Sequence, residues 1–180
     1  MEDVHLAFLG YGPLIAWLRT QAGAARYGGR VHVVDAVAPH ELLDWIIGVD
    51  IAVVPIQPST LNHLYSSPNK VFEAIAVGTP IAGSDFPEFR KVVLDAEGGP
   101  LGLLFDPTVP TEIAVAIRTL LGLSIEERVV LRDRCRSSAL RRWNWEVESR
   151  ALVGIYGRLA GDARVARSPI AATLIDRSAA

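Results

Sequence analysis

Short apolar segments alternate with amphipathic helical segments along most of this chain, and this alternation is the feature that most constrains its fold. The apolar segments have at most seven residues, and each is bounded by glycine, proline or aspartate, which is typical of buried strands. Strands that are apolar on both faces indicate a parallel sheet that is covered by helices on each side. The sequence therefore predicts an α/β fold of this kind, with strands in residues 4–10, 31–34, 50–56, 80–84 and 101–107.

Composition narrows the possible classes of protein. With 180 residues, of which 50% are hydrophobic, the chain is long enough for one domain, which we place at residues 1–160. Residues 161–180 show no periodicity, so we expect a loose tail there. The net charge of −2 disfavours a nucleic-acid-binding protein, which is usually basic. Cys135 is the single cysteine, so the sequence offers neither a disulfide framework nor a cysteine-based metal site, and we expect a cytoplasmic protein.

The segment SSPNKVFEAIAVGTP, residues 66–80, has the pattern of a loop that leads into a helix. Ser67 is predicted to cap the helix, Pro68 suits its first position, and Gly78 suits its end. Lys70 then falls in the first turn, where the helix dipole disfavours a cation. A lysine at this place suggests that a negatively charged group lies nearby.

Two interpretations of this helix start stay open on the residues alone. In the first, the free backbone N–H groups and Lys70 bind a diphosphate, and Glu73 accepts hydrogen bonds from the hydroxyls of a ribose. In the second, Lys70 and Glu73 are solvated residues on an ordinary helix. His63, in the preceding loop, has the same two interpretations: a contact to a sugar or phosphate, or an ordinary loop histidine.

A longer segment, SSPNKVFEAIAVGTPIAGSDFPE, resembles the donor-binding motif of glycosyltransferases of the GT-B fold, close to glycosyltransferase family 4. Members of that family commonly carry Ser-Pro-x-Lys-x-x-Glu, then Gly-x-Pro, and then a strand that leads to Pro-Glu. The flanking segments are similar to the family in the same order, from FLGYGP to the closing helix, so the resemblance covers residues 4–160.

This resemblance implies a Rossmann-like domain, the donor-binding half of a GT-B fold that lacks its first strand. It also implies transfer of a sugar, of the hexosyl type, from a UDP- or GDP-sugar to an unidentified acceptor, without a metal or other cofactor. The resemblance implies that Glu73 binds the ribose and that the diphosphate and sugar pocket is lined by Ser67, Asn69 and Lys70. The resemblance also implies that the nucleotide base lies beside Val37.

Two departures from the family keep other functions open. Tyr65 stands where many relatives have a second glutamate, which orients the donor sugar. The acceptor-binding N-terminal domain carries the catalytic base in relatives, and we expect it on a separate or missing segment, so we assign no catalytic residue here. The alternatives are a non-catalytic nucleotide-binding or interaction module, and a sugar-nucleotide epimerase of the same fold.

An arginine-rich helix is predicted near the C-terminus. We interpret its arginines as a solvated face, and the alternative is attraction to anionic lipid, with peripheral contact to a membrane surface. No run of about 18 apolar residues is present, so we expect no membrane span. The arginines concerned are Arg128, Arg132, Arg134, Arg136, Arg141 and Arg142.

Overall fold

The computed structural model describes residues 4–94 and 96–160, which divide into two compact units. The first unit is Met1–Trp45 and the second is Ile46–Ala180, and each is described by itself. The predicted tail at residues 161–180 lies outside the described residues. The assignment of residues 1–160 to one domain stays a prediction.

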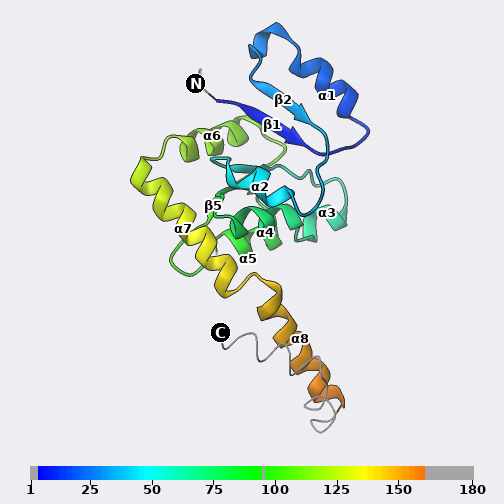
Figure 1. Cartoon of the computed structure of the whole chain (residues 1–180), viewed down its shortest axis with the longest axis vertical. Helices are drawn as coiled ribbons and strands as arrows, with labels where there is room; N and C mark the ends of the chain where they lie inside the picture. The colour runs from blue at the N-terminus through cyan, green and yellow to red at the C-terminus, as the bar shows by residue number, and fades with distance from the viewer. Residues whose placement is uncertain (1–3, 95, 161–180) are drawn as a thin grey trace. The chain divides into compact units, whose positions relative to one another are not determined.

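The first unit contains one β-α-β motif (Figure 1). Strands β1 (Leu6–Leu9) and β2 (Val31–Val34) are parallel, with Leu6 opposite Val31. Helix α1 (Ile15–Ala22) and the short 3₁₀ helix η1 (Ala25–Tyr27) connect them, and α1 packs on β2. Among the described residues 4–45 none is buried, and even Phe8 of β1 is 37% exposed. The hydrophobic core of the described chain therefore belongs to the second unit.

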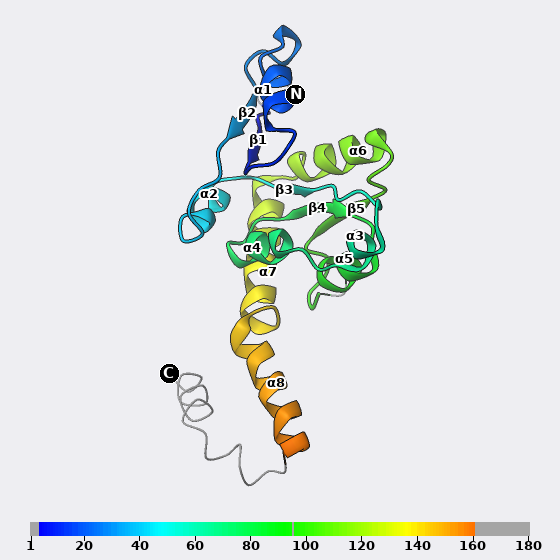
Figure 2. The same cartoon turned by 90° about the vertical axis from the view of Figure 1, so that its right-hand side faces the viewer.

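The second unit contains a sheet of three parallel strands in the order β3-β4-β5 (Figure 2). Ile81 pairs with Ala52 on one side and with Gly102 on the other, so β4 is the central strand. Helix α2 (Leu42–Ile47) spans the division between the units. The remaining elements are β3 (Ala52–Val54), α3 (Leu61–Tyr65), α4 (Asn69–Ala76), β4 (Ile81–Ser84), α5 (Pro87–Val93), β5 (Gly102–Phe105), α6 (Pro110–Leu121), α7 (Ile125–Arg141) and α8 (Trp145–Ala160).

Helices cover both faces of this sheet. Figure 2 shows α6 on one side of the three strands and α4 and α5 on the other, and α7 packs along α4. All four residues of β4 are buried, as expected for a central parallel strand. Ile75 of α4, Val93 of α5 and Cys135 of α7 are each 0% exposed in the same core. The predicted parallel α/β fold with helices on both faces is thus confirmed, and its strands form two sheets.

Arginines on α7 bind the carboxyl ends of other helices. Arg132 donates to two backbone carbonyls at the end of α2, each at 3.0 Å. Arg136 donates to the carbonyl of Ala76, the last residue of α4, and Arg128 donates to carbonyls at the end of α6. Helix carboxyl ends carry unpaired carbonyls and partial negative charge, which guanidinium groups neutralise. The arginine-rich face therefore has a structural role that the sequence did not indicate, and a lipid contact stays a prediction.

Cys135 is expected to be unreactive toward thiol reagents in the folded protein. Burial raises the pKa of its thiol to about 12, and its Sγ donates to the carbonyl of Leu101 at 3.4 Å. The thiolate, which is the nucleophile, is therefore scarce at neutral pH. Titration with Ellman's reagent checks this: we expect no rapid reaction in buffer and one reactive thiol per chain in guanidinium chloride. Rapid reaction of the native protein would show instead that α7 separates readily from the core that buries Cys135.

Candidate functional site

Helix α4 begins two residues after Ser67. Its N-cap is Pro68, which has no side-chain capping bond, so the prediction that Ser67 caps this helix is wrong. The Ser67 hydroxyl donates instead to Oε2 of Glu88, at 3.3 Å. The predicted end of the helix is confirmed, because Gly78 follows it with φ of +77°. A Cβ at Gly78 would lie 3.0 Å from the carbonyl oxygen of Arg132 in α7. The close approach of α7 is therefore a second reason for a glycine at position 78.

Asn69, Lys70 and Glu73 lie in the first two turns of α4. Asn69 and Lys70 are exposed and Glu73 is half-buried, whereas Val71 and Ile75 face the core. Within the described part of the chain, neither the Lys70 ammonium nor the Glu73 carboxylate has a hydrogen-bond or ion-pair partner. Both groups are therefore available to a ligand at the start of the helix.

The topology of the sheet places this helix start at a ligand-binding edge. Strands β3 and β4 are parallel neighbours, and α3 and α4 lie between them in the chain. Helix α4 ends shortly before the amino end of β4, so its start points toward the carboxyl-end edge of the strands. Helix α5 begins near the carboxyl end of β4. Open α/β sheets bind ligands outside the carboxyl ends of their strands. The first N–H groups of a helix have no partner within the helix, and together with its dipole they attract anions.

Glu88 connects the two helix starts. One oxygen of its carboxylate accepts from Ser67, which precedes α4, and the other accepts from the ammonium group of Lys91 on α5. The hydrogen bond from Lys91 is the main cause of a pKa of Glu88 below its usual value. The Pro87-Glu88 pair ends the segment that resembles the donor-binding motif, and the residues alone leave Glu88 open between a structural role and a donor contact. Nothing in the sequence indicates its pairing with Lys91.

The two remaining predicted site residues are placed differently. His63 is an exposed residue of α3, and its Nδ1 is 2.8 Å from the hydroxyl oxygen of Ser59, four residues earlier. Its role as a donor contact stays a prediction, since this local bond also suits an ordinary loop histidine. Val37 follows β2 and belongs to the first unit, whereas α4 belongs to the second. The contact of Val37 with the nucleotide base also stays a prediction.

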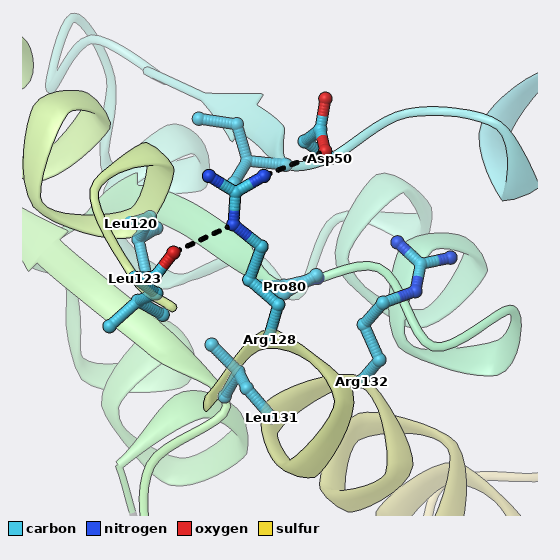
Figure 3. A pocket seen from close by; sticks show the side chains of 8 residues that line it. Asp50, Pro80, Leu120, Leu123, Arg128, Leu131 and Arg132 are labelled. Atoms are coloured by element: carbon cyan, nitrogen blue, oxygen red, sulfur yellow. Dashed lines mark hydrogen bonds and ion pairs between the residues drawn. The ribbon is translucent and has the colours of Figure 1, made fainter. Parts of the chain in front are cut away.

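A small cavity lies at the opposite end of the sheet (Figure 3). Its walls include Asp50 and Pro80, which come shortly before β3 and directly before β4, so it lies at the amino ends of these strands. Its volume is about 20 Å³, enough for a water molecule but not for a nucleotide. Arg128 lines it and is bound to Asp50 at 3.3 Å and to the carbonyl of Leu123 at 3.1 Å. Residues of α6 and α7 line this cavity together with the amino ends of the strands, and no residue from the start of α4 lines it.

Residues 4–94 and 96–160 contain no group of three or more His, Cys, Asp and Glu side chains placed to hold a metal ion. None of the helices within these residues combines the length and the apolar character needed to cross a membrane.

Two solved structures resemble this chain. Sucrose-phosphate synthase from Thermosynechococcus elongatus superimposes with a TM-score of 0.67 and 23% identity, over 88% of this chain and 39% of that one. AviGT4, a glycosyltransferase involved in avilamycin A biosynthesis, superimposes with a TM-score of 0.53 and 22% identity, over 87% of this chain and 44% of that one. At these identities the likeness shows the fold, which is that of GT-B glycosyltransferases.

Sequence comparison gives the family. Phosphatidyl-myo-inositol mannosyltransferase of Mycobacterium tuberculosis is 33% identical over 92 residues, which are 49% of this chain and 23% of that protein. The enzyme of the same name from Mycobacterium leprae is 33% identical over 91 residues, with 49% and 22% covered. The match thus spans about a quarter of the length of these relatives. The family model described as glycosyl transferases group 1 matches residues 1–122, and the chain therefore belongs to the group 1 glycosyltransferases.

Proposed function

We propose that this chain is the donor-binding part of a glycosyltransferase that uses a UDP- or GDP-sugar. The observation that carries the proposal is the start of α4, where Lys70 and Glu73 lie without partners among the described residues. This helix lies within the segment that the family model matches, residues 1–122. Family membership favours a transferase over an epimerase or a non-catalytic module.

In this proposal, positively charged groups bind one part of the donor and a negatively charged group binds another. The N–H groups at the start of α4 and the Lys70 ammonium bind the diphosphate, and Glu73 accepts hydrogen bonds from the ribose hydroxyls. In the reaction the bond between the sugar's anomeric carbon and the phosphate oxygen breaks, and a bond to an acceptor hydroxyl oxygen forms. The helix start and Lys70 stabilise the departing diphosphate, which needs no metal ion at this point. The acceptor's proton goes to a base on a separate acceptor-binding domain.

Calorimetric titration of the folded chain with UDP and GDP tests this function. We expect saturable binding of one of the two nucleotides. Glu73→Ala is expected to weaken that binding by about tenfold or more, because hydrogen bonds to a carboxylate contribute more than a factor of ten each. Glu148→Ala is the matched control, since Glu148 is exposed on α8, outside residues 1–122.

Circular dichroism must first show that both variants keep the wild-type fold. Equal affinities of Glu73→Ala and Glu148→Ala would remove Glu73 from the site. A folded chain that binds neither nucleotide would contradict the proposal for this chain.

A further inference from the structure

The Glu88 carboxylate is held in place at the edge of the sheet where the donor is proposed to bind. It comes four residues after the end of β4, in the first turn of α5. Its Oε2 accepts from Ser67 at 3.3 Å, and its Oε1 accepts from Lys91. Ser67 lies two residues before α4, so this hydrogen bond joins Glu88 to the segment that leads into the proposed diphosphate site.

This carboxylate is charged and partly open to solvent. The side chain of Glu88 is 27% exposed, and that of Lys91 is 58% exposed. Hydrogen bonds from Lys91 and Ser67 lower the pKa of the Glu88 carboxyl, so it is ionised at neutral pH. A carboxylate has about four lone-pair positions, and each oxygen of Glu88 has one partner among the described residues. Acceptor positions therefore remain for hydroxyl groups of a ligand.

The charge of Glu88 determines which part of a sugar nucleotide it suits. A fixed carboxylate repels a diphosphate, whereas it accepts charge-assisted hydrogen bonds from uncharged hydroxyl groups. The Lys70 side of the α4 start has the opposite charge and suits the phosphates. Glu73 lies one turn further along α4 and is already assigned to the ribose. The remaining hydroxyl-rich part of the donor is the sugar that is transferred.

We propose that Glu88 is a specificity-determining residue that accepts hydrogen bonds from hydroxyl groups of the donor sugar. Ser67 and Lys91 fix the direction of the carboxylate, so that it is preorganised for those hydroxyls. The inference rests on the proposed function, because it needs the diphosphate at the start of α4. It adds a contact to the sugar itself, from the first turn of α5.

The test compares binding of a sugar nucleotide with binding of its nucleotide. Wild type and Glu88→Gln are titrated calorimetrically with UDP-glucose and UDP, and with GDP-mannose and GDP. For the base that the protein accepts, we expect wild type to bind the sugar nucleotide more tightly than the nucleotide. In Glu88→Gln we expect the affinity for the sugar nucleotide to fall by about tenfold, and that for the nucleotide to change by less than about twofold.

The ratio of the two affinities separates a sugar contact from indirect effects. Loss of the carboxylate also releases Lys91, whose ammonium would favour the more highly charged terminal phosphate of the nucleotide. The comparison is therefore repeated in a Lys91→Met background, where the same selective loss of sugar-nucleotide affinity is expected from Glu88→Gln. Glu97→Gln is the control, because Glu97 is 88% exposed and pairs with Arg141 at 3.7 Å, and it should leave both affinities unchanged. Equal weakening of both ligands in Glu88→Gln, or no change in either, overturns the proposal. If wild type binds neither ligand, the proposed function fails instead.

Discussion

Gly102→Ala is expected to destabilise the second unit strongly, because the added methyl group has no space between two paired strands. A Cβ on Gly102 would lie 1.9 Å from the carbonyl oxygen of Ile81, the residue paired with it on β4. Since the obstacle is backbone, the two strands must move apart. Overpacking of a core costs about 1–3 kcal/mol and sometimes more, so we expect a loss at the top of this range. Thermal denaturation should show a Tm lower by roughly 10 °C.

Gly154→Ala is the matched control for this prediction. Gly154 lies inside α8, where an added Cβ would meet only the far end of Arg158, at 3.8 Å. Alanine is favoured over glycine inside a helix by about 0.5–1 kcal/mol, so this variant should be slightly stabilised. Equal melting temperatures for the two variants would mean that β4 and β5 do not approach each other as closely as the structure shows.

The five strands follow from local patterns of residues, and the structure contains a strand within each predicted range. The segment at residues 80–84 predicts β4, which is Ile81–Ser84, since a short apolar run after a glycine turn is sufficient evidence. Ser124 likewise caps α7 with a complete capping box, in which Glu127 accepts from its backbone N–H. A capping serine followed three residues later by glutamate is a local signal.

Strand pairing is a non-local property, which explains why two sheets were not predicted. In the doubly wound order 3-2-1-4-5-6, the second and fourth strands are both neighbours of the first. The resemblance to the GT-B family assigns the described strands to positions two to six. In this order 3-2 and 4-5-6 are two runs of neighbouring strands, and they correspond to the sheets β2-β1 and β3-β4-β5. The residues of each strand do not show which neighbour it has.

The candidate site shows the same division between local and non-local information. Lys70 and Glu73 were predicted together because they lie three residues apart on one helix. The bond between Ser67 and Glu88 joins residues 21 positions apart, so no spacing in the sequence indicates it. It also explains why the cap prediction for Ser67 is wrong, because its hydroxyl is directed toward α5 and away from the first turn of α4.

Lys70→Met is expected to weaken binding of UDP or GDP by at least about tenfold, because a charge-assisted hydrogen bond to a phosphate is lost. The thermal stability of the same variant should not fall and should rise slightly. Lys70 is the second residue of α4, and a cation near a helix N-terminus is unfavourable by about 0.3–1 kcal/mol. The variant should therefore melt at the same temperature as wild type or slightly higher. Calorimetric titration and thermal denaturation of the same preparation check both signs.

The opposite signs distinguish a ligand-binding lysine from a structural one. A structural lysine would lower the melting temperature when it is removed, and the weaker binding would then follow from partial unfolding. Lys70→Arg keeps the charge and should retain most of the affinity, and its titration at rising salt should show a steeper loss than that of Lys70→Met. Unchanged binding in Lys70→Met would mean that the diphosphate does not lie at the start of α4. Binding of the diphosphate would explain why a lysine occupies the first turn of α4, where it is unfavourable for the helix itself.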